Sequence, residues 1–126
     1  MPRTTALDNV ALPMVYAGYS KEDRNKRASE VLTQVGLADR MDHKPNQLSG
    51  GQRQRVAVAR ALVNKPSIIL ADEPTGNLDS KNTQIVFDIF QELTKNYGQT
   101  IIAVTHDDDF AKRSDRIIEM KDGEVI

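Results

Sequence analysis

The chain has 126 residues, enough for one small domain and short for two. Its formal net charge of -1 gives no electrostatic case for a nucleic-acid partner, and the absence of cysteine excludes disulfides and thiolate metal sites. No apolar run approaches the roughly 20 residues needed to cross a bilayer, so any link to a membrane is expected to come through a partner.

The first 65 residues are predicted to be helical. A short helix is expected over 5–12, where Pro13 would stop it. A second helix is expected to begin after the N-cap Ser20 and to end at Gly36. A third, rich in Ala and Val, is expected over 49–63 with most of its faces buried.

Strands and helices alternate from residue 66 onwards. The apolar runs 67–71 and 100–105 are typical of strands buried in a parallel sheet. Between them, Ser80 is expected to cap a helix that ends near Gly98. The remaining predictions are a helix over 107–113, a strand over 116–120 and a hairpin turn at Lys121-Asp122-Gly123. This order predicts an α/β fold, divided into a helical unit, 1–65, and a strand-containing unit, 66–126.

A glycine-containing string opens the third predicted helix. It reads Leu48-Ser49-Gly50-Gly51-Gln52. The two glycines allow a ligand to approach the backbone closely, free amides at a helix N-terminus attract an anion, and the Ser49 hydroxyl can donate to a phosphate oxygen. Taken alone, the string fits a serine N-cap with a glycine turn equally well.

Two carboxylates and a histidine follow the two predicted buried strands. Asp72 and Glu73 lie where parallel α/β sheets bind ligands, so Asp72 can hold the water shell of Mg²⁺ and Glu73 can polarise an attacking water. The alternative is two solvated acids at a strand end. His106 ends the next strand, which is expected to bring it beside Glu73, although a lone histidine is more often structural.

Taken in order, these segments resemble the motifs of the ATPase domain of ABC transporters. Leu48–Gln52 resembles the signature motif, and Ile68–Glu73 resembles the Walker B strand with its catalytic glutamate. Gly76–Asp79 is similar to the D-loop, and His106 to the switch histidine. The wording of 71–80 is most similar to the branch that serves lipoprotein release, macrolide export and the cell-division transporter.

The resemblance implies a role for each matching residue. Ser49–Gln52 would contact the γ-phosphate of an ATP held by a second ATPase domain in a head-to-tail dimer. Asp72 would bind Mg²⁺ through water, Glu73 would be the general base, and His106 would stabilise the γ-phosphate. Asp79 would couple the two ATP sites across the dimer. The resemblance also implies an integral-membrane permease as partner, and therefore a cytoplasmic protein, peripheral at the inner face of the cell membrane.

The sequence lacks a motif that complete members of this family contain. Complete ATPase domains carry a P-loop, Gly-x-x-x-x-Gly-Lys-Ser/Thr, ahead of the signature, and no such string occurs in the 126 residues. The expected fold is therefore the helical subdomain followed by part of a RecA-like P-loop NTPase core, without the half that contains the P-loop. We expect these residues alone to bind ATP and Mg²⁺ poorly and to be inactive.

Two other functions fit the sequence. The chain can be a non-catalytic helical module that docks to a membrane permease through 16–40, a segment that equally fits a solvated amphipathic helix. DNA-repair and chromosome-structure ATPases have related signatures, but their coiled-coil insertions do not occur here. Since the earlier strands of the sheet are also missing, we expect the chain to self-associate through the exposed sheet edge or to be loosely folded.

Overall fold

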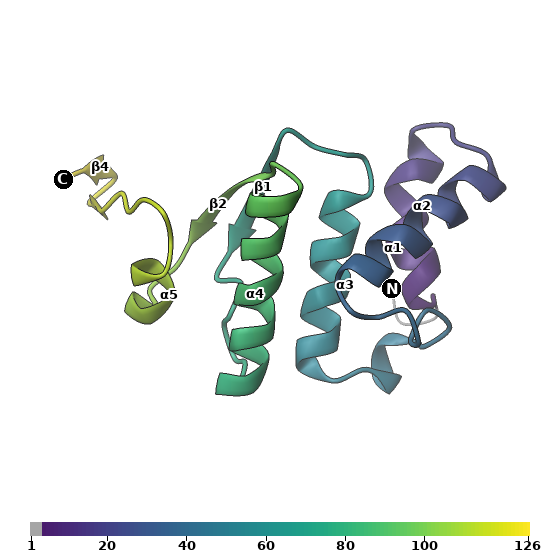
Figure 1. Cartoon of the computed structure of the whole chain (residues 1–126), viewed down its shortest axis with the longest axis horizontal. Coiled ribbons are helices and arrows are strands. Elements are labelled where there is room, and N and C mark those ends of the chain that lie inside the picture. The colour runs from purple at the N-terminus through teal and green to yellow at the C-terminus, as the bar shows by residue number, and fades with distance from the viewer. Residues whose placement is uncertain (1–3) are drawn as a thin grey trace.

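The computed structural model describes residues 4–126, and its elements follow one another along the long axis of the molecule (Figure 1). Helices α1, α2 and α3 lie at one end, α4 and strands β1 and β2 lie in the middle, and α5 with the β3–β4 hairpin lies at the other end. The elements are α1 Ala6–Tyr16, α2 Lys21–Gln34, the 3-10 turn Pro45–Gln47, α3 Gly50–Leu62, β1 Ile68–Asp72, α4 Ser80–Asn96, β2 Thr100–Val104, α5 Asp108–Lys112, β3 Met120–Lys121 and β4 Glu124–Val125. Within residues 4–126, no helix is long and apolar enough to span a membrane.

Helix α1 continues through Pro13, so the prediction that this proline stops the helix is wrong. The Thr5 side chain caps the helix by accepting from the Asp8 backbone N–H at 3.2 Å. An interior proline costs about 3 kcal/mol. Met14, the next residue, is only 5% exposed, and burying a methionine side chain stabilises by about 1.5–3 kcal/mol. Packing of α1 against α2 and α3 therefore outweighs most of the local cost.

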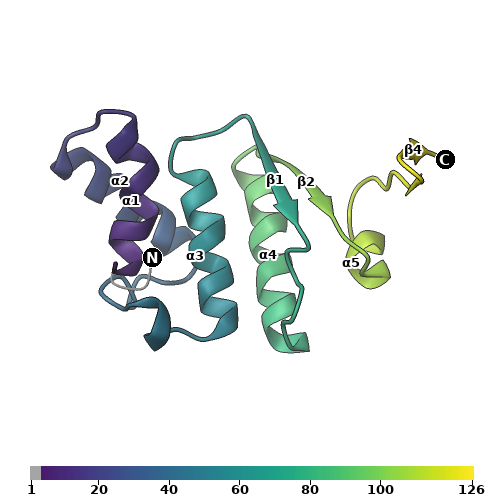
Figure 2. The same ribbon diagram turned by 180° about the vertical axis from the view of Figure 1, so that it is seen from behind.

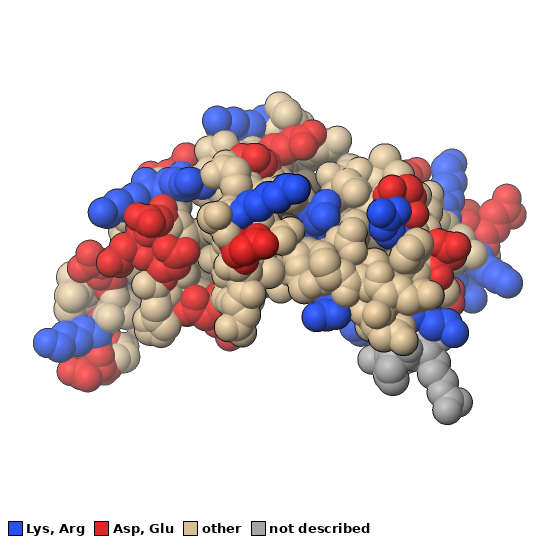
Figure 3. All heavy atoms as spheres, turned by 90° about the horizontal axis from the view of Figure 1, so that it is seen from below, with Lys and Arg blue, Asp and Glu red and all other residues tan. Residues whose placement is uncertain are grey.

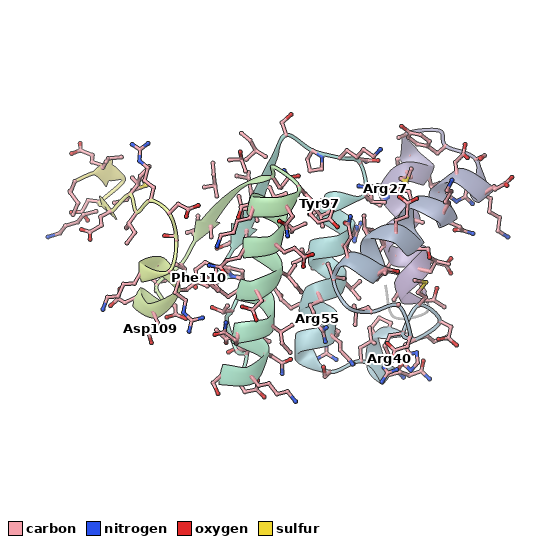
Figure 4. The ribbon with its side chains drawn as sticks, viewed as in Figure 1. Arg27, Arg40, Arg55, Tyr97, Asp109 and Phe110 are labelled. Carbon is pink, nitrogen blue, oxygen red and sulfur yellow. The ribbon has the colours of Figure 1, made fainter. Side chains whose placement is uncertain are left out.

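Two arginines join α2 and α3, because each donates to backbone oxygens at the C-terminal end of the other helix (Figure 4). Arg27 in α2 donates to the backbone oxygens of Val63 at 3.1 Å and Leu62 at 3.2 Å. Arg55 in α3 donates to the Val35 oxygen at 3.2 Å, where α2 ends. Burial lowers the pKa of Arg55, and the nearby Asp39 partly opposes this shift. Each guanidinium thus offsets the negative end of the neighbouring helix, which ties α2 to α3.

Helix α4 covers one face of a two-stranded parallel sheet formed by β1 and β2. The strands pair in register, with Ile69 opposite Ile101 and Asp72 opposite Val104. The N-cap of α4 is Asp79 and not Ser80 as predicted, because the Asp79 carboxylate accepts from the Asn82 backbone N–H at 2.8 Å. The buried residues of this helix are Val86, Phe87, Ile89, Phe90 and Leu93.

The other face of the sheet is open among the described residues, which contradicts the prediction that both strands are fully buried. Side chains alternate along each strand. Ile69 is 4% exposed under α4, whereas Leu70 is 77% exposed and Val104 61% exposed on the opposite face. Figure 2, which looks at the molecule from this side, shows no helix in front of the strands. The strands have the composition of a sheet with two covered faces but have one covered face here.

The C-terminal residues form a short hairpin. The predicted strand over 116–120 is wrong, because only Met120 and Lys121 pair, with Val125 and Glu124. Residues 116–119 have no strand beside them within residues 4–126, and a segment without a neighbouring strand does not form a ladder. The turn lies where it was predicted, with φ of 53° at Asp122 and 80° at Gly123, the conformation of a two-residue type I′ turn.

Candidate functional site

The predicted functional residues lie at element ends that face the same side of the molecule. The N-termini of α3 and α4 and the carboxyl ends of β1 and β2 all point to the lower side in Figure 1. Figure 3 looks onto that side and shows basic and acidic side chains interspersed over it. Carboxyl ends of parallel strands and N-termini of helices are where α/β proteins bind anionic ligands.

Glu73 occupies a tight turn directly after β1. Its φ is 46°, which is uncommon for a residue other than glycine and costs of order 1–3 kcal/mol. Two backbone hydrogen bonds hold it there: its N–H donates to the Val104 oxygen at 2.7 Å, and its oxygen accepts from the Gly76 N–H at 2.9 Å. A Cβ added to Gly76 would lie 3.2 Å from the Glu73 oxygen, so the turn leaves little room for a side chain there. The backbone therefore fixes the direction of the Glu73 side chain.

The Glu73 carboxylate meets the end of β2. One oxygen accepts from the His106 backbone N–H at 2.9 Å, and the other accepts from the Thr105 hydroxyl at 3.2 Å. The His106 ring nitrogen Nε2 lies 3.8 Å from the first oxygen, and the His106 side chain is 98% exposed. The structure thus places His106 beside Glu73, with the imidazole free to contact a ligand. Glu73 is itself 38% exposed, so water can reach its remaining lone pairs.

Sequence reasoning missed the hydroxyls that support this carboxylate. Thr105 donates to Glu73 and accepts from the Asp107 backbone N–H at 2.9 Å. The buried Thr75 hydroxyl donates to the Asp107 carboxylate at 3.4 Å. Asp107 also caps α5 by accepting from the backbone N–H of Phe110 at 3.2 Å. The only sequence signal was position, since Thr105 immediately precedes the predicted site histidine.

Asp72 is the candidate metal ligand and lies exposed at the last position of β1. Within residues 4–126, no three His, Cys, Asp or Glu side chains are placed to hold a metal together. Mg²⁺ usually takes one or two protein carboxylates and completes its octahedron with water and substrate phosphates. One exposed carboxylate at a strand end fits that pattern, so Asp72 is chemically suited to Mg²⁺ in company with a phosphate ligand.

Ser49 begins α3 with a reciprocal cap. Its hydroxyl accepts from the Gln52 N–H at 3.1 Å, and the Gln52 side chain accepts from the Ser49 N–H at 3.0 Å. Arg53 braces the preceding turn by donating to the Leu48 oxygen at 2.9 Å. The interpretation of Ser49 as an N-cap is therefore confirmed. It does not exclude anion binding, because the Ser49 hydroxyl proton remains free and both Ser49 and Gly50 are exposed.

Gly51 is buried, unlike its neighbour Gly50, because α4 packs against it. A Cβ on Gly51 would overlap the side-chain amide of Asn82 and lie 3.0 Å from the Asn82 Cβ. The Asn82 amide donates in turn to the Asp79 carboxylate at 3.0 Å. The structure thus brings Gly51 and Asp79 together through Asn82. The two sets of predicted residues remain separate, since no hydrogen bond within residues 4–126 joins 49–52 to Asp72, Glu73 or His106.

Comparisons with known proteins show the family to which this sequence is similar. The sequence profile of a family described as ABC transporter matches residues 1–76. The macrolide export ATP-binding/permease protein MacB of Bartonella henselae is 60% identical over 122 residues, which are 97% of this chain and 18% of that protein. The lipoprotein-releasing system ATP-binding protein LolD of Bacteroides thetaiotaomicron is 51% identical over 125 residues, 99% of this chain and 57% of that protein. Both belong to the branch that residues 71–80 indicate.

Solved structures give the same relationship. An ATP-binding cassette solved as a dimer in a post-hydrolysis state, bound to ADP and Pi, superposes with a TM-score of 0.83 at 50% sequence identity. The match covers 99% of this chain and 56% of that one. The α/β fold with parallel strands is therefore confirmed as that of an ABC ATPase cassette. The chain spans about half the length of this cassette and of the lipoprotein-releasing relative.

Proposed function

The chain belongs to the ABC transporter family, and from this premise we propose that it works in an ATP-hydrolysing subunit that couples ATP hydrolysis to membrane transport. The observation that carries the proposal is the Glu73 carboxylate, oriented by Thr105 and the His106 N–H and open to water. Residues 1–65 would be the helical subdomain and 66–126 part of the ATPase core, with the division in the loop between α3 and β1.

In the proposed reaction, Glu73 accepts a proton from the water that attacks the γ-phosphate. Its two hydrogen bonds hold the carboxylate in one direction, which lowers the entropy cost of positioning that water. The exposed His106 imidazole donates to a γ-phosphate oxygen as negative charge develops there. Asp72 would hold Mg²⁺ through water, and the ion would supply neutralisation of phosphate charge.

The signature residues would serve an ATP held by another domain. The exposed Ser49 hydroxyl and the free amides of the first turn of α3 would bind its γ-phosphate. The separation of this segment from Glu73 supports this proposal. It is expected if one chain contributes Ser49–Gln52 to one ATP molecule and Glu73 to another. The related cassette that was solved as a dimer with ADP and Pi also supports a second ATPase domain as partner.

Residues 1–126 alone are expected to release no phosphate from ATP above the blank. No P-loop string is present to compensate the triphosphate charge or to supply the Ser/Thr ligand of Mg²⁺. Phosphate release should appear when a P-loop segment from a related cassette is added as a complementing fragment. The measurement is colorimetric phosphate release with and without that fragment. Steady turnover by the 126 residues alone would contradict the proposed dependence.

A second candidate function is docking to a permease without catalysis. Apolar side chains are exposed where α1 ends, with Tyr16 81% exposed, Tyr19 50% and Val15 43%. Of these, Tyr19 lines an open pocket of about 300 Å³ together with Asp23 and Arg27 of α2. Exposed aromatic residues beside charges are typical of protein interfaces. In either function, this surface would hold the protein at the inner face of the membrane. Complementation by the P-loop fragment distinguishes the ATP-hydrolysing subunit from the non-catalytic module.

The isolated chain is expected to self-associate through the exposed edge of the β1–β2 sheet and the open apolar face that adjoins it. Leu70, Val104, Ile68 and Ile102 are all at least half exposed there. Burying about 400 Å² of apolar surface is worth roughly 10 kcal/mol before entropy is subtracted, which is comparable to the stability of a small domain. Light scattering over a concentration series should therefore show oligomers, and the Leu70→Glu variant should shift them towards monomer.

A matched control keeps this prediction specific. Ile118→Glu adds the same charge at a side chain that is 59% exposed outside the sheet, and it should leave the association unchanged. A compact monomer with one sharp cooperative melt at every concentration would show that the sheet face does not drive association.

A further inference from the structure

We propose that Asn82 is a positioning residue that links the Asp79 carboxylate to the N-terminus of α3 at Gly51. Its consequence for ATP use rests on the proposed function, in which α3 begins at the phosphate-binding string. The link itself is a property of the folded chain. It predicts that a change at the exposed Asp79 side chain is transmitted to the backbone of 49–51 through one side chain on α4.

The geometry of the Asn82 side chain supports this role. Asp79 caps α4 with one carboxylate oxygen, which accepts from both the Asn82 backbone N–H at 2.8 Å and the Asn82 side-chain NH₂ at 3.0 Å. The two bonds to one charged acceptor restrict the Asn82 side chain to a single direction. That direction puts its amide against Gly51, in the space that a Cβ on Gly51 would occupy. The amide thus touches a carboxylate on one side and a helix backbone on the other.

The contact with Gly51 can act on the exposed part of the string. Ser49 and Gln52 close the first turn of α3 with two reciprocal hydrogen bonds, so this turn moves as one piece. Asp79, Ser49 and Gly50 are exposed, whereas Gly51, which faces α4, is buried. A partner that pulls on Asp79 would therefore release or reorient the Asn82 amide, and the freed space would let the N-terminus of α3 shift.

Glycine-selective ¹⁵N labelling gives a direct test without nucleotide. The chain has seven glycines, so the spectrum contains few signals, and Gly18, Gly98 and Gly123, which have no atoms near their Cβ positions, serve as internal standards. Asp79→Asn keeps a good N-cap but removes the charge that holds the Asn82 amide. It should move the Gly50 and Gly51 signals much further than the signals of those three glycines. At least half of that shift should disappear when Asn82→Ala is also present.

A control variant makes the outcome decisive. Ser80→Ala changes the neighbouring exposed residue of the first α4 turn and should leave the Gly51 signal in place. An equal Gly51 shift from Asp79→Asn with and without Asn82, or no shift at all, would overturn the proposal. Because no ATP is present, neither result of this experiment tests the proposed ATPase function. Conversely, an inactive complemented enzyme would not contradict the link through Asn82.

A double-mutant cycle tests the contact independently. Gly51→Ala should lower the urea midpoint strongly or prevent folding, since its Cβ meets the Asn82 amide. The same substitution in the Asn82→Ala background should recover most of the loss, because the smaller side chain opens the space. Gly50→Ala is the matched control, as the nearest atom to its Cβ is the Arg53 guanidinium at 4.0 Å. Equal losses from Gly51→Ala in both backgrounds would show that Asn82 does not make the contact.

Discussion

Replacing Glu73 with glutamine is expected to lower ATP hydrolysis by about 100-fold or more while ATP binding is retained, since a positioned general base contributes about 10²–10⁴-fold. The enzyme for this test is the chain complemented with a P-loop fragment. Glutamine cannot remove a proton from water. It can nevertheless occupy the same place, because its amide oxygen can accept from the His106 N–H and its NH₂ can donate to the Thr105 hydroxyl.

The expected split between binding and turnover separates a chemical role from a structural one. Binding is measured with a fluorescent ATP analogue and turnover by phosphate release, on the same preparation. Glu73→Ala is the comparison variant, because it leaves the Thr105 hydroxyl and the His106 N–H without acceptors and should also lower stability. If Glu73→Gln abolished nucleotide binding, or left turnover near that of the unchanged chain, Glu73 would not be the general base.

Features that depend on neighbours in the sequence were predicted correctly. Ser20 caps its helix as predicted, and Ser49, for which a cap was one of two interpretations, does so as well. In both, a hydroxyl reaches a backbone N–H three residues ahead, which involves only local geometry. The Asp122-Gly123 turn follows from two residues that tolerate positive φ. The order of helices and strands followed from periodicity, and it was enough to place Asp72, Glu73 and His106 at strand ends.

Features that depend on distant contacts were not predictable. Pro13 lies inside α1 because α2 and α3 pack against that helix, and local propensity contains no information on that packing. Ser80 and Asp79 are both good caps, and the choice of Asp79 is linked to the Asn82 side chain beside α3. The strand predicted over 116–120 pairs only at Met120, because residues 116–119 have no neighbouring strand among the described residues.

The candidate site shows the same division. The residues in recognisable motifs were found from sequence, whereas their supports were missed. Thr105 donates to Glu73, which lies 32 residues earlier in the chain. Asn82 lies against Gly51 across a contact between two helices. Threonine and asparagine have no distinctive pattern at such separations. A folded chain is needed to show that one orients a carboxylate and the other fills the space beside a glycine.

Phe110→Ala is expected to detach α5 and to cost about 3–5 kcal/mol, the usual range for removing a buried phenylalanine. Phe110, labelled on α5 in Figure 4, is 7% exposed. It packs edge-on against Phe87 at 5.7 Å and Phe90 at 6.2 Å between ring centroids. Helix α5 has only five residues, too few to be stable without this contact. The loss should therefore be concentrated in the C-terminal unit, and the urea transition should broaden or split.

Hydrogen exchange locates the effect. Amides of 107–113 should exchange much faster in Phe110→Ala, while those around the buried Val31 and Leu32 in α2 should keep their protection. Phe110→Leu is the matched control and should lose less, since leucine retains most of the apolar contact with Phe87 and Phe90. Detachment of α5 would also take Asp107 away from Thr105, so the support of the Glu73 carboxylate would weaken with it. Uniform loss of protection across both units would instead mean that Phe110 stabilises the whole chain, and unchanged exchange at 107–113 would mean that other contacts hold α5.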